Sequence, residues 1–395
     1  MKLKLRQRLL LLCFFLLITF GLLTGRLAYL QLARGKELAR KAVHQRAQIV
    51  ILDYNRGDIL DKNGISLLGG EREKVLALFP GLLAKVDQQE QERLSTLIPV
   101  TSLPGQPSVV LRKLSDLEEA RFNALGCRGL AVAEAQKRYG DQALATHLVG
   151  HVGPDDGEGK VGLELAYNEL LKGSMPNLLA AVVDGRNDLI RGIGFRLWEG
   201  PASFRPYSLV LTIDNTIQRK VEEIMDQRVE RGAVIVMDPQ SGDILAMASR
   251  PNYFQANLTD YLQGRDGDIN FLETQPFINR SILSYPPGSV FKIVVAAAAL
   301  EVGNYSLDSL FHCPGFRQVG DKLFHCYQNK SHGQLTLAQA FAHSCNTAFI
   351  ELAMELGRQT ISDYATRLGL GQVCGLPLGE KIQGGETAGH IPQPR

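Results

Sequence analysis

The sequence lacks long runs of like charge, internal repeats and low-complexity tracts. Its 43 basic and 41 acidic residues give a formal net charge of only +2 at pH 7, so the charge balance indicates no polyanionic partner, and we expect no nucleic acid to bind. With 45% hydrophobic and 21% charged residues, the 395-residue chain has the composition of a globular protein. It is long enough for two or three domains with their own cores.

Motifs with metal-ligand spacing are also absent. No CxxC or HExxH pattern occurs and the eight histidines are scattered, so the linear sequence predicts no metal site. Of the six cysteines, Cys313 and Cys326 bracket a predicted hairpin whose turn lies at residues 319–322. In an oxidising compartment this pair would close the hairpin as a disulfide. The alternative, two buried free thiols, fits the sequence equally well.

The N-terminus combines a basic flank with an apolar run. Lys2, Lys4, Arg6 and Arg8 precede the run Leu9–Leu23, and residues 25–32 extend it with Arg26 as their only charge. This pattern is typical of a membrane-inserted signal whose basic end stays in the cytoplasm. Because no small-x-small cleavage site follows, we expect a retained anchor rather than a removed signal peptide. The alternative, a buried helix of a soluble domain, does not account for the concentration of basic residues in the first eight positions.

Beyond the anchor, the pattern divides the chain into three regions. Residues 26–47 are rich in Ala, Leu and Arg and predict a helical stalk, and residues 48–197 mix short strands such as Gln48–Asp53 with helices such as Asp116–Leu125. After the turn at residues 198–201, a predicted strand at Tyr207–Asp214 leads to a helix capped by Asp214. A hairpin with strands at 232–238 and 244–250 follows, and then helices at 290–301, 336–343 and 347–356. Strands followed by a helical block predict an α+β fold, an antiparallel sheet with helices packed on it.

Ser289 and Lys292 lie at the start of one predicted helix, in the segment YPPGSVFK. The two prolines suit a helix entrance, and Gly288 permits a sharp turn there. One helical turn places the lysine on the same face as the serine. The apolar residues that follow would lower the pKa of Lys292, so that its neutral amine can take the serine proton. A Ser N-cap beside a surface lysine explains the same letters, so this segment alone leaves both interpretations open.

A second element, Ser344-Cys345-Asn346, lies between two Ala-rich predicted helices. It would place a second hydroxyl and an amide in the same cleft, the one to relay a proton and the other to orient a peptide-like substrate. Taken alone, these three residues are better explained as a polar turn between helices. The combination with the first element favours the catalytic interpretation.

The two elements together resemble the Ser-x-x-Lys and Ser-x-Asn motifs of penicillin-recognising serine enzymes. NRSILSYPPGSVFKIVVAAAALE and HGQLTLAQAFAHSCNTAFIELAMELG are similar to segments of the class B penicillin-binding proteins (penicillin-binding protein 2 or FtsI-like), the monofunctional transpeptidases that cross-link peptidoglycan. RGDILDKNG, HLVGHVG and GKVGLELAYNELLKG resemble the membrane-proximal pedestal of that family. GAVIVMDPQSGDILAMASRPNYFQAN resembles the first hairpin of its catalytic domain. The resemblance covers essentially all of the chain from Leu9 onward.

The resemblance implies a role for each motif residue. Ser289 would attack the penultimate D-alanine carbonyl of a stem peptide, and Lys292 would take the serine proton. Ser344 would pass a proton to the leaving amine, and Asn346 would bind the substrate amide. A neighbouring stem peptide would then attack the acyl-enzyme and form the cross-link, and a β-lactam would acylate Ser289 instead. The resemblance implies no metal and no organic cofactor.

The resemblance also implies an architecture and a location. We expect a basic tail and transmembrane anchor at residues 1–32, a stalk and elongated mixed α/β pedestal at 33–200, and part of a penicillin-binding, serine β-lactamase-like transpeptidase domain at 201–395. The N-terminus would be cytoplasmic and the bulk of the chain extracytoplasmic on a bacterial cell membrane. The implied partners are peptidoglycan stem peptides, β-lactam antibiotics, the membrane, and the glycosyltransferase and scaffold proteins of wall synthesis.

One departure concerns the third motif of the family, Lys-Thr-Gly or Lys-Ser-Gly, which helps to bind the substrate carboxylate and contributes to the oxyanion hole. Neither version occurs in the 395 residues, and Lys330-Ser331-His332 lacks the glycine. We therefore expect the sequence to be truncated at its C-terminus, without a donor worth about 3–4 kcal/mol of transition-state stabilisation. This departure keeps an alternative function open, a non-catalytic membrane-anchored module of the wall-synthesis machinery or a β-lactam-binding sensor.

Overall fold

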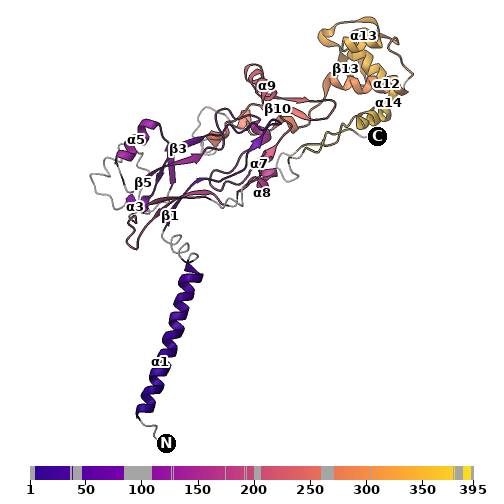
Figure 1. The fold of residues 1–395 in the computed structure, drawn as a ribbon. Helices are drawn as coiled ribbons and strands as arrows, with labels where there is room; N and C mark the ends of the chain where they lie inside the picture. The colour runs from indigo at the N-terminus through magenta and orange to yellow at the C-terminus, as the bar shows by residue number, and fades with distance from the viewer. Residues whose placement is uncertain are drawn as a thin grey trace. The chain divides into compact units, whose positions relative to one another are not determined.

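The computed structural model describes residues 5–35, 38, 47–83, 109–125, 127, 129–173, 175–190, 192, 194–199, 206–258, 271–302, 304–376, 378 and 386–392. The chain divides into two compact units. Figure 1 labels many of its helices and strands. Unit 1 comprises residues 1–60, 66–143 and 169–210, and unit 2 comprises residues 61–65, 144–168 and 211–395. Because the chain passes between the units more than once, the domain boundaries near residues 32 and 200 stay predictions.

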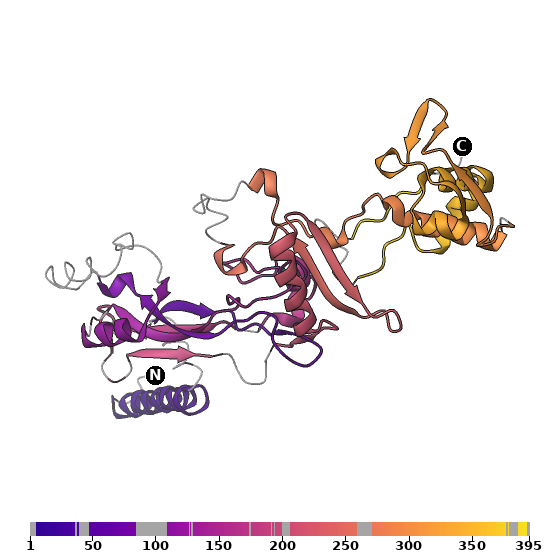
Figure 2. The ribbon, with the colours of Figure 1, turned by 90° about the horizontal axis from the view of Figure 1, so that it is seen from above.

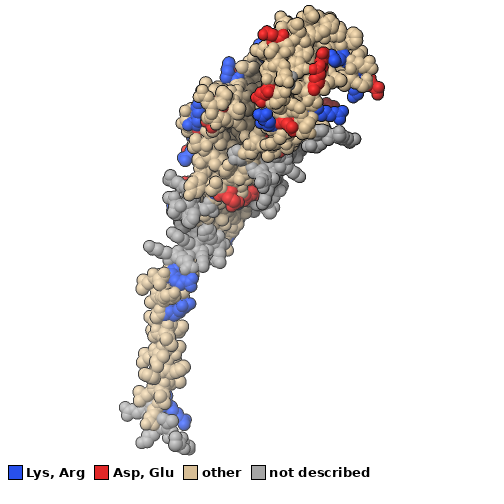
Figure 3. All heavy atoms as spheres, turned by 90° about the vertical axis from the view of Figure 1, so that its right-hand side faces the viewer, with Lys and Arg blue, Asp and Glu red and all other residues tan. Residues whose placement is uncertain are grey.

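The apolar N-terminal run forms helix α1 (Leu5–Ala28), which a π-helical turn, η1 (Tyr29–Ala33), continues. Within the described residues it is the one helix long and apolar enough to cross a membrane, over the 24 residues Leu10–Ala33. At about 1.5 Å per residue this span exceeds the roughly 30 Å of a bilayer core. Figure 3 shows it as a rod of uncharged side chains with basic residues only towards its ends. Of the predicted stalk, residues 36–37 and 39–46 lie outside the described residues.

Unit 1 contains two three-stranded antiparallel sheets. In the first, β6 (Asn177–Val182) lies between β1 (Ala47–Asp53) and β7 (Phe195–Trp198), and β1 confirms the strand predicted at 48–53. In the second, β3 (Arg72–Leu78) lies between β4 (Val109–Lys113) and β5 (Leu130–Gln136). Three short helices accompany the sheets: α3 (Pro80–Leu83), α5 (Asp116–Leu125), found as predicted, and α8 (Asn168–Leu171). Apolar residues that alternate along β1, β3 and β6 form the core of the unit, among them Val50, Ala77, Phe79 and Leu179.

The strand predicted at Tyr207–Asp214 is largely wrong. Only Leu209 and Val210 form a strand, β8, which pairs in parallel with β2 (Ile59–Leu60). The rest of the segment makes isolated hydrogen bonds and no strand pairing. Thr212 Oγ1 donates to the Ile244 carbonyl at 2.7 Å, and the Asp214 N–H donates to the Leu245 carbonyl at 2.9 Å. Apolar and polar residues alternate along the segment, as in a strand, but among the described residues no neighbouring strand of equal length pairs with it.

Unit 2 opens with short helices α6 (Thr146–Val149) and α7 (Gly162–Ala166) and the longer α9 (Asn215–Arg228). The predicted cap is confirmed, because the Asp214 carboxylate accepts from the Thr216 and Ile217 N–H groups at the N-terminus of α9. The predicted hairpin is confirmed as β9 (Gly232–Met237) paired antiparallel with β10 (Ile244–Arg250). Helix α9 lies along this hairpin in both ribbon views (Figure 2).

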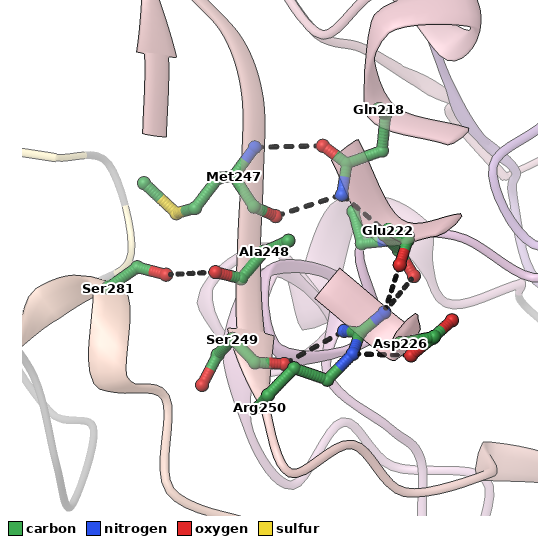
Figure 4. Close-up of polar contacts among 9 residues, drawn as sticks. Gln218, Glu222, Asp226, Met247, Ala248, Ser249, Arg250 and Ser281 are labelled. Atoms are coloured by element: carbon green, nitrogen blue, oxygen red, sulfur yellow. Dashed lines mark hydrogen bonds and ion pairs between the residues drawn. The ribbon is translucent and has the colours of Figure 1, made fainter. Parts of the chain in front are cut away.

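A buried polar network joins α9 to β10 (Figure 4). Gln218 donates to and accepts from the backbone of Met247 at 3.0 and 2.8 Å, which extends the edge of β10 through a side chain. Arg250, almost fully buried, lies 2.6 Å from Asp226 Oδ1 and 3.5 Å from Glu222 Oε2. Glu222 in turn accepts from the Gln218 side chain at 2.7 Å. Each charge in the network is thus paired, as burial requires.

The remainder of unit 2 is the helical block. Short helices precede it: η3 (Gln255–Asn257), α11 (Phe271–Thr274), η4 (Arg280–Ile282) and η5 (Gly288–Phe291). Helix α12 (Lys292–Val302) is followed by β11 (Leu310–Cys313), the hairpin β12 (Phe316–Val319) and β13 (Lys322–His325), η6 (Tyr327–Asn329) and β14 (Gly333–Thr336), which pairs with β11. Helices α13 (Leu337–Ala342) and α14 (Asn346–Arg367) complete it. The three predicted helices are confirmed. Within α14 the backbone is non-helical at Gly357, with φ of 78° and ψ of 159°, directly after the predicted end at residue 356, and a second helical segment continues to Arg367.

Helices α12 and α14 pack against each other and share a core with the strands around them. Val295 and Ala299 of α12 contact this core from one side, and Ala348 and Leu352 of α14 from the other. The alanine-rich sequence of α12 permits the close approach, since small side chains let the two backbones lie near each other. The packing fixes the start of α12 relative to the start of α14, the two points where the predicted motifs lie.

Candidate active site

Ser289 lies on an exposed turn at the entrance to α12. Gly288 has a left-handed backbone with φ of 57°, a conformation that glycine adopts without cost, and it follows Pro287, whose ring fixes φ near −71°. The chain then forms the single 3₁₀ turn η5 (Gly288–Phe291), and the α-helix proper begins at Lys292. The helix therefore starts two residues later than predicted. The serine hydroxyl is open to solvent and lies one turn before the lysine.

Lys292 lies at the centre of the predicted residues and is half-buried. Its Nζ lies 3.3 Å from Ser289 Oγ and 2.9 Å from Ser344 Oγ. It also lies 2.7 Å from both the Ser344 carbonyl oxygen and Asn346 Oδ1. The structure thus brings all four predicted residues, Ser289, Lys292, Ser344 and Asn346, into one cluster within unit 2. The chemical roles assigned to them stay predictions.

The surroundings of Lys292 lower the pKa of its ammonium group. Burial removes water from the charge and is the main cause, while the cysteines Cys345 and Cys326 act weakly in the opposite direction. The Phe349 ring lies 5.9 Å from Nζ and forms part of the apolar wall. A lowered pKa increases the fraction of neutral amine at a given pH, and only the neutral amine can accept a proton from Ser289.

The Ser344-Cys345-Asn346 segment is the tight turn between α13 and α14. The backbone of Ser344 is left-handed, with φ of 49°, and the Cys345 N–H donates to the Ala340 carbonyl at 2.9 Å. Asn346 is the first residue of α14, and its Nδ2 donates to the His325 carbonyl at 2.7 Å. That bond orients the amide so that Oδ1 faces Lys292. His325 is a contributor that sequence reasoning missed, and no side-chain pattern could reveal it because its backbone carbonyl makes the contact.

A second cluster, also missed from the sequence, lies directly behind this turn. It consists of Cys313, Cys326, His332 and Cys345, whose Sγ and ring nitrogen atoms all lie within 4.8 Å of one another. We call it the thiol cluster. Its sulfur–sulfur distances are 3.6 Å for Cys313–Cys326 and 3.8 Å for Cys326–Cys345, and His332 Nδ1 lies 3.3 Å from Cys313 Sγ. The three thiols are buried and free, so Cys313 and Cys326 are neighbours but are not joined as a disulfide.

The thiol cluster has the chemistry of a metal-ligand set. Three sulfurs and one imidazole nitrogen match the tetrahedral Cys₃His set that holds zinc in proteins. Burial raises the pKa of the Cys313 thiol, but hydrogen bonds, including that from His332, outweigh it and lower the pKa to about 6. The sequence has no metal-ligand spacing because β11, the hairpin, β14 and the turn after α13 bring the four residues together only in the fold.

Comparison with known proteins gives a family for part of the chain. Residues 232–391 match the penicillin-binding protein transpeptidase domain family. The chain is 28% identical over 397 aligned positions to stage V sporulation protein D of Bacillus subtilis, covering 94% of this chain and 58% of the relative. It is 27% identical to the peptidoglycan D,D-transpeptidase MrdA of Escherichia coli, covering 95% of this chain and 64% of the relative. The chain thus spans about three fifths of the length of these relatives.

Solved structures show the same fold. One belongs to a peptidoglycan synthase complex that coordinates polymerisation and crosslinking, with a TM-score of 0.63 and 24% identity over 98% of this chain and 70% of that one. Another is penicillin-binding protein 2 in complex with MreC from Helicobacter pylori, with a TM-score of 0.59 and 23% identity over 88% of this chain and 69% of that one. The predicted α+β fold, with its apolar N-terminal helix and penicillin-binding transpeptidase architecture, is confirmed. Residues 232–391 thus match a penicillin-binding protein transpeptidase domain, and over most of its length the chain is similar to class B penicillin-binding proteins.

Proposed function

We propose that this chain is a serine-type peptidoglycan D,D-transpeptidase that forms its acyl-enzyme on Ser289. The observation that supports the proposal most directly is the position of Lys292 Nζ. This amine lies 3.3 Å from one hydroxyl, that of Ser289, and 2.9 Å from another, that of Ser344. A lysine whose pKa is lowered by burial, within reach of two hydroxyls, is suited to moving a proton between them.

In the acylation half-reaction, protons move among three members of the cluster, Ser289, Lys292 and Ser344. The neutral Lys292 amine accepts the Ser289 proton as Oγ attacks the carbonyl carbon of the penultimate D-alanine. The C–N bond to the terminal D-alanine then breaks, and Ser344 Oγ delivers a proton from Lys292 to the leaving amine. The products are an ester on Ser289 and free D-alanine, and Lys292 is neutral again.

The second half-reaction reverses these proton movements. The amine of a neighbouring stem peptide attacks the ester carbonyl, its proton passes back through Ser344 and Lys292 to Ser289 Oγ, and the new amide is the cross-link. Asn346 binds the substrate amide. Its Oδ1 and Nδ2 are already engaged with Lys292 and the His325 carbonyl, but each retains one further hydrogen-bonding position.

β-Lactam antibiotics are proposed as inhibitors of the same site. The strained lactam carbonyl takes the place of the D-alanine carbonyl, and ring opening leaves the departing nitrogen attached to the acyl group. The covalent product therefore stays on Ser289 instead of releasing a leaving group. A long-lived adduct of this kind is also the most direct probe of the site.

We propose a single-pass membrane protein with a cytoplasmic N-terminus. Helix α1 supports the membrane span, and the basic residues before it support the orientation. Proposed partners are the glycosyltransferase and scaffold proteins of wall synthesis, since similar chains occur in structures of a peptidoglycan synthase complex and of a complex with MreC. Protease digestion of intact spheroplasts tests the orientation, because only extracytoplasmic residues are then cleaved.

Labelling with a fluorescent penicillin tests the proposed function. We expect a covalent label on the wild-type chain that is lost in Ser289→Ala and retained in Ser241→Ala, an exposed serine in the β9–β10 turn. Peptide mapping should place the adduct on Ser289. A folded wild-type chain that takes up no label would contradict the proposal and favour the alternative, a module that binds wall-synthesis partners without catalysis.

A further inference from the structure

The proposed reaction leaves the thiol cluster without a role, although the cluster adjoins the site at two points. Cys345 is the middle residue of Ser344-Cys345-Asn346, so its neighbours on both sides contact Lys292. Cys326 directly follows His325, whose carbonyl holds the Asn346 amide. A change in the cluster therefore reaches Asn346 through two short backbone connections.

Within the cluster, Cys313 and Cys326 are the pair placed for direct bonding. Their sulfurs are 3.6 Å apart, and the residues bracket the β12–β13 hairpin, whose base is closed by the Cys326 N–H bonded to the Gly315 carbonyl at 2.9 Å. Cys345 Sγ lies slightly farther from Cys326 Sγ, at 3.8 Å, and closer to Thr347 Oγ1, at 3.3 Å against 3.7 Å for Cys326 Sγ, and its backbone is fixed in the turn. Both cysteines are buried, while the neighbouring His332 is only half-buried and the hairpin residues Lys322–His325 are exposed.

We propose that Cys313 and Cys326 are a site of reversible oxidation, and that forming their disulfide displaces Asn346 and slows acylation of Ser289. The oxidant is a small peroxide. One thiolate attacks a peroxide oxygen to give a sulfenic acid, releasing hydroxide from hydrogen peroxide. The second thiol then attacks that sulfur and expels water, so two thiols and one peroxide yield one disulfide and two waters.

The disulfide changes the geometry because its bond is far shorter than the present separation. Closing 3.6 Å to a bond of about 2.05 Å moves the sulfurs together by about 1.5 Å. Cys326 directly follows the exposed strand β13, whereas Cys313 lies within β11, which pairs with β14, so we expect Cys326 to move more. The His325 carbonyl moves with it, and the Asn346 amide loses the partner that aims Oδ1 at Lys292.

The effect on acylation rests on the proposed function, so the experiment reads the thiols, the turn and the activity separately. Purified full-length protein is stripped with a chelator and reduced, and one half is then treated with hydrogen peroxide. We expect a mass lower by two hydrogens, a crosslinked peptide pair containing Cys313 and Cys326, and faster hydrogen–deuterium exchange in peptides spanning residues 336–349. The rate of fluorescent penicillin labelling should fall by about tenfold or more, because a shift of about 1 Å in a group of the active site is enough to slow a reaction by that much. The rate should recover when a thiol reductant is added.

Matched variants separate this effect from other oxidation. In Cys313→Ser combined with Cys326→Ser, peroxide should leave the exchange and the labelling rate unchanged, whereas Cys374→Ser, which alters an exposed cysteine outside the cluster, should respond as the wild type does. A disulfide between Cys326 and Cys345, no disulfide at all, or a disulfide without faster exchange would overturn the proposal. If the reduced protein takes up no label, the proposed function fails, and the crosslink and exchange measurements still decide the redox inference.

Discussion

Lys292 Nζ lies 2.7 Å from Asn346 Oδ1, closer than its 3.3 Å to Ser289 Oγ. The lysine is therefore held by a neutral acceptor, which stabilises its position without adding a negative charge. A carboxylate at the same position would hold the lysine as tightly but would favour its charged form. The identity of residue 346 thus contributes to the proton affinity of the proposed base as well as to substrate binding.

Asn346→Asp should move the pH dependence of acylation. In the wild type the pKa of Lys292 is lowered, so the labelling rate should rise with pH through a value below 10.5, as the amine loses its proton. The new carboxylate raises that pKa, so the rising limb should move to higher pH. The rate at pH 7 should fall by about tenfold for every pH unit that the limb moves, because the neutral amine becomes that much rarer. Labelling rates measured from pH 6 to 10 provide the test.

Asn346→Ala is the matched control for this prediction. It removes the substrate contact and the acceptor at 2.7 Å from Lys292 Nζ without adding a charge, so its rate should fall while the pH limb moves to lower pH, opposite to the shift expected for aspartate. Identical pH profiles for the aspartate and alanine variants would show that Lys292 is not the group that titrates.

Glu222→Ala should destabilise the protein strongly, because among the described residues it leaves the buried Arg250 guanidinium with Asp226 as its only carboxylate partner. Removing one partner of a buried pair costs about 3–5 kcal/mol. Glu223→Ala is the control, since Glu223 pairs with Lys220 on the surface and its loss should cost less than about 1 kcal/mol. Thermal unfolding midpoints of the two variants compare these costs directly, and equal midpoints would refute the importance of the network.

His147 should make the protein less stable in mild acid. Burial, the main cause, lowers its pKa to about 4 from 6.5, although the bond from Nε2 to the Pro276 carbonyl acts in the opposite direction. Between these values the unfolded chain binds a proton that the folded chain does not. Stability therefore falls as the pH drops from about 6.5 to about 4, by roughly 2–4 kcal/mol from this group.

The measurement is the unfolding midpoint as a function of pH. His147→Gln should lose less stability between pH 6.5 and 4 than the wild type does, whereas His343→Gln, which alters an exposed histidine, should follow the wild-type curve. If both variants follow the wild type, another group accounts for the acid sensitivity.

Zinc should compete with oxidation for the thiol cluster. A Zn²⁺ ion held by Cys313, Cys326, His332 and Cys345 would occupy the sulfurs that the disulfide requires. Adding Zn²⁺ to the reduced protein should raise the unfolding midpoint and slow disulfide formation by peroxide. Cys345→Ser, which removes one ligand but neither member of the pair, should weaken the protection. Equal oxidation rates with and without zinc would contradict this prediction.

The sequence was sufficient for features with local causes. The helix at Asp116–Leu125, the Asp214 cap and the β9–β10 hairpin follow from short-range propensity, and the structure has each of them. The proximity of Ser289 to Lys292 follows from one helical turn. Such features need no knowledge of where the rest of the chain lies.

Features that depend on distant partners could not be predicted in this way. The strand expected at Tyr207–Asp214 shrinks to Leu209–Val210, because β2 offers only two residues to pair with. The thiol cluster joins residues from four separate segments, so no spacing rule could reveal it. The orienting role of His325 comes from a backbone carbonyl, a group that every residue possesses.

The left-handed backbone of Ser344 costs stability, whereas its side chain serves the proposed reaction. With φ of 49°, the position suits glycine, and a residue with a side chain there stores on the order of 1 kcal/mol of strain. The hydroxyl that would relay the proton is the reason to retain that strain. Ser344→Gly should therefore yield a more stable protein that acylates more slowly, so that selection for robustness alone would erase the proposed relay.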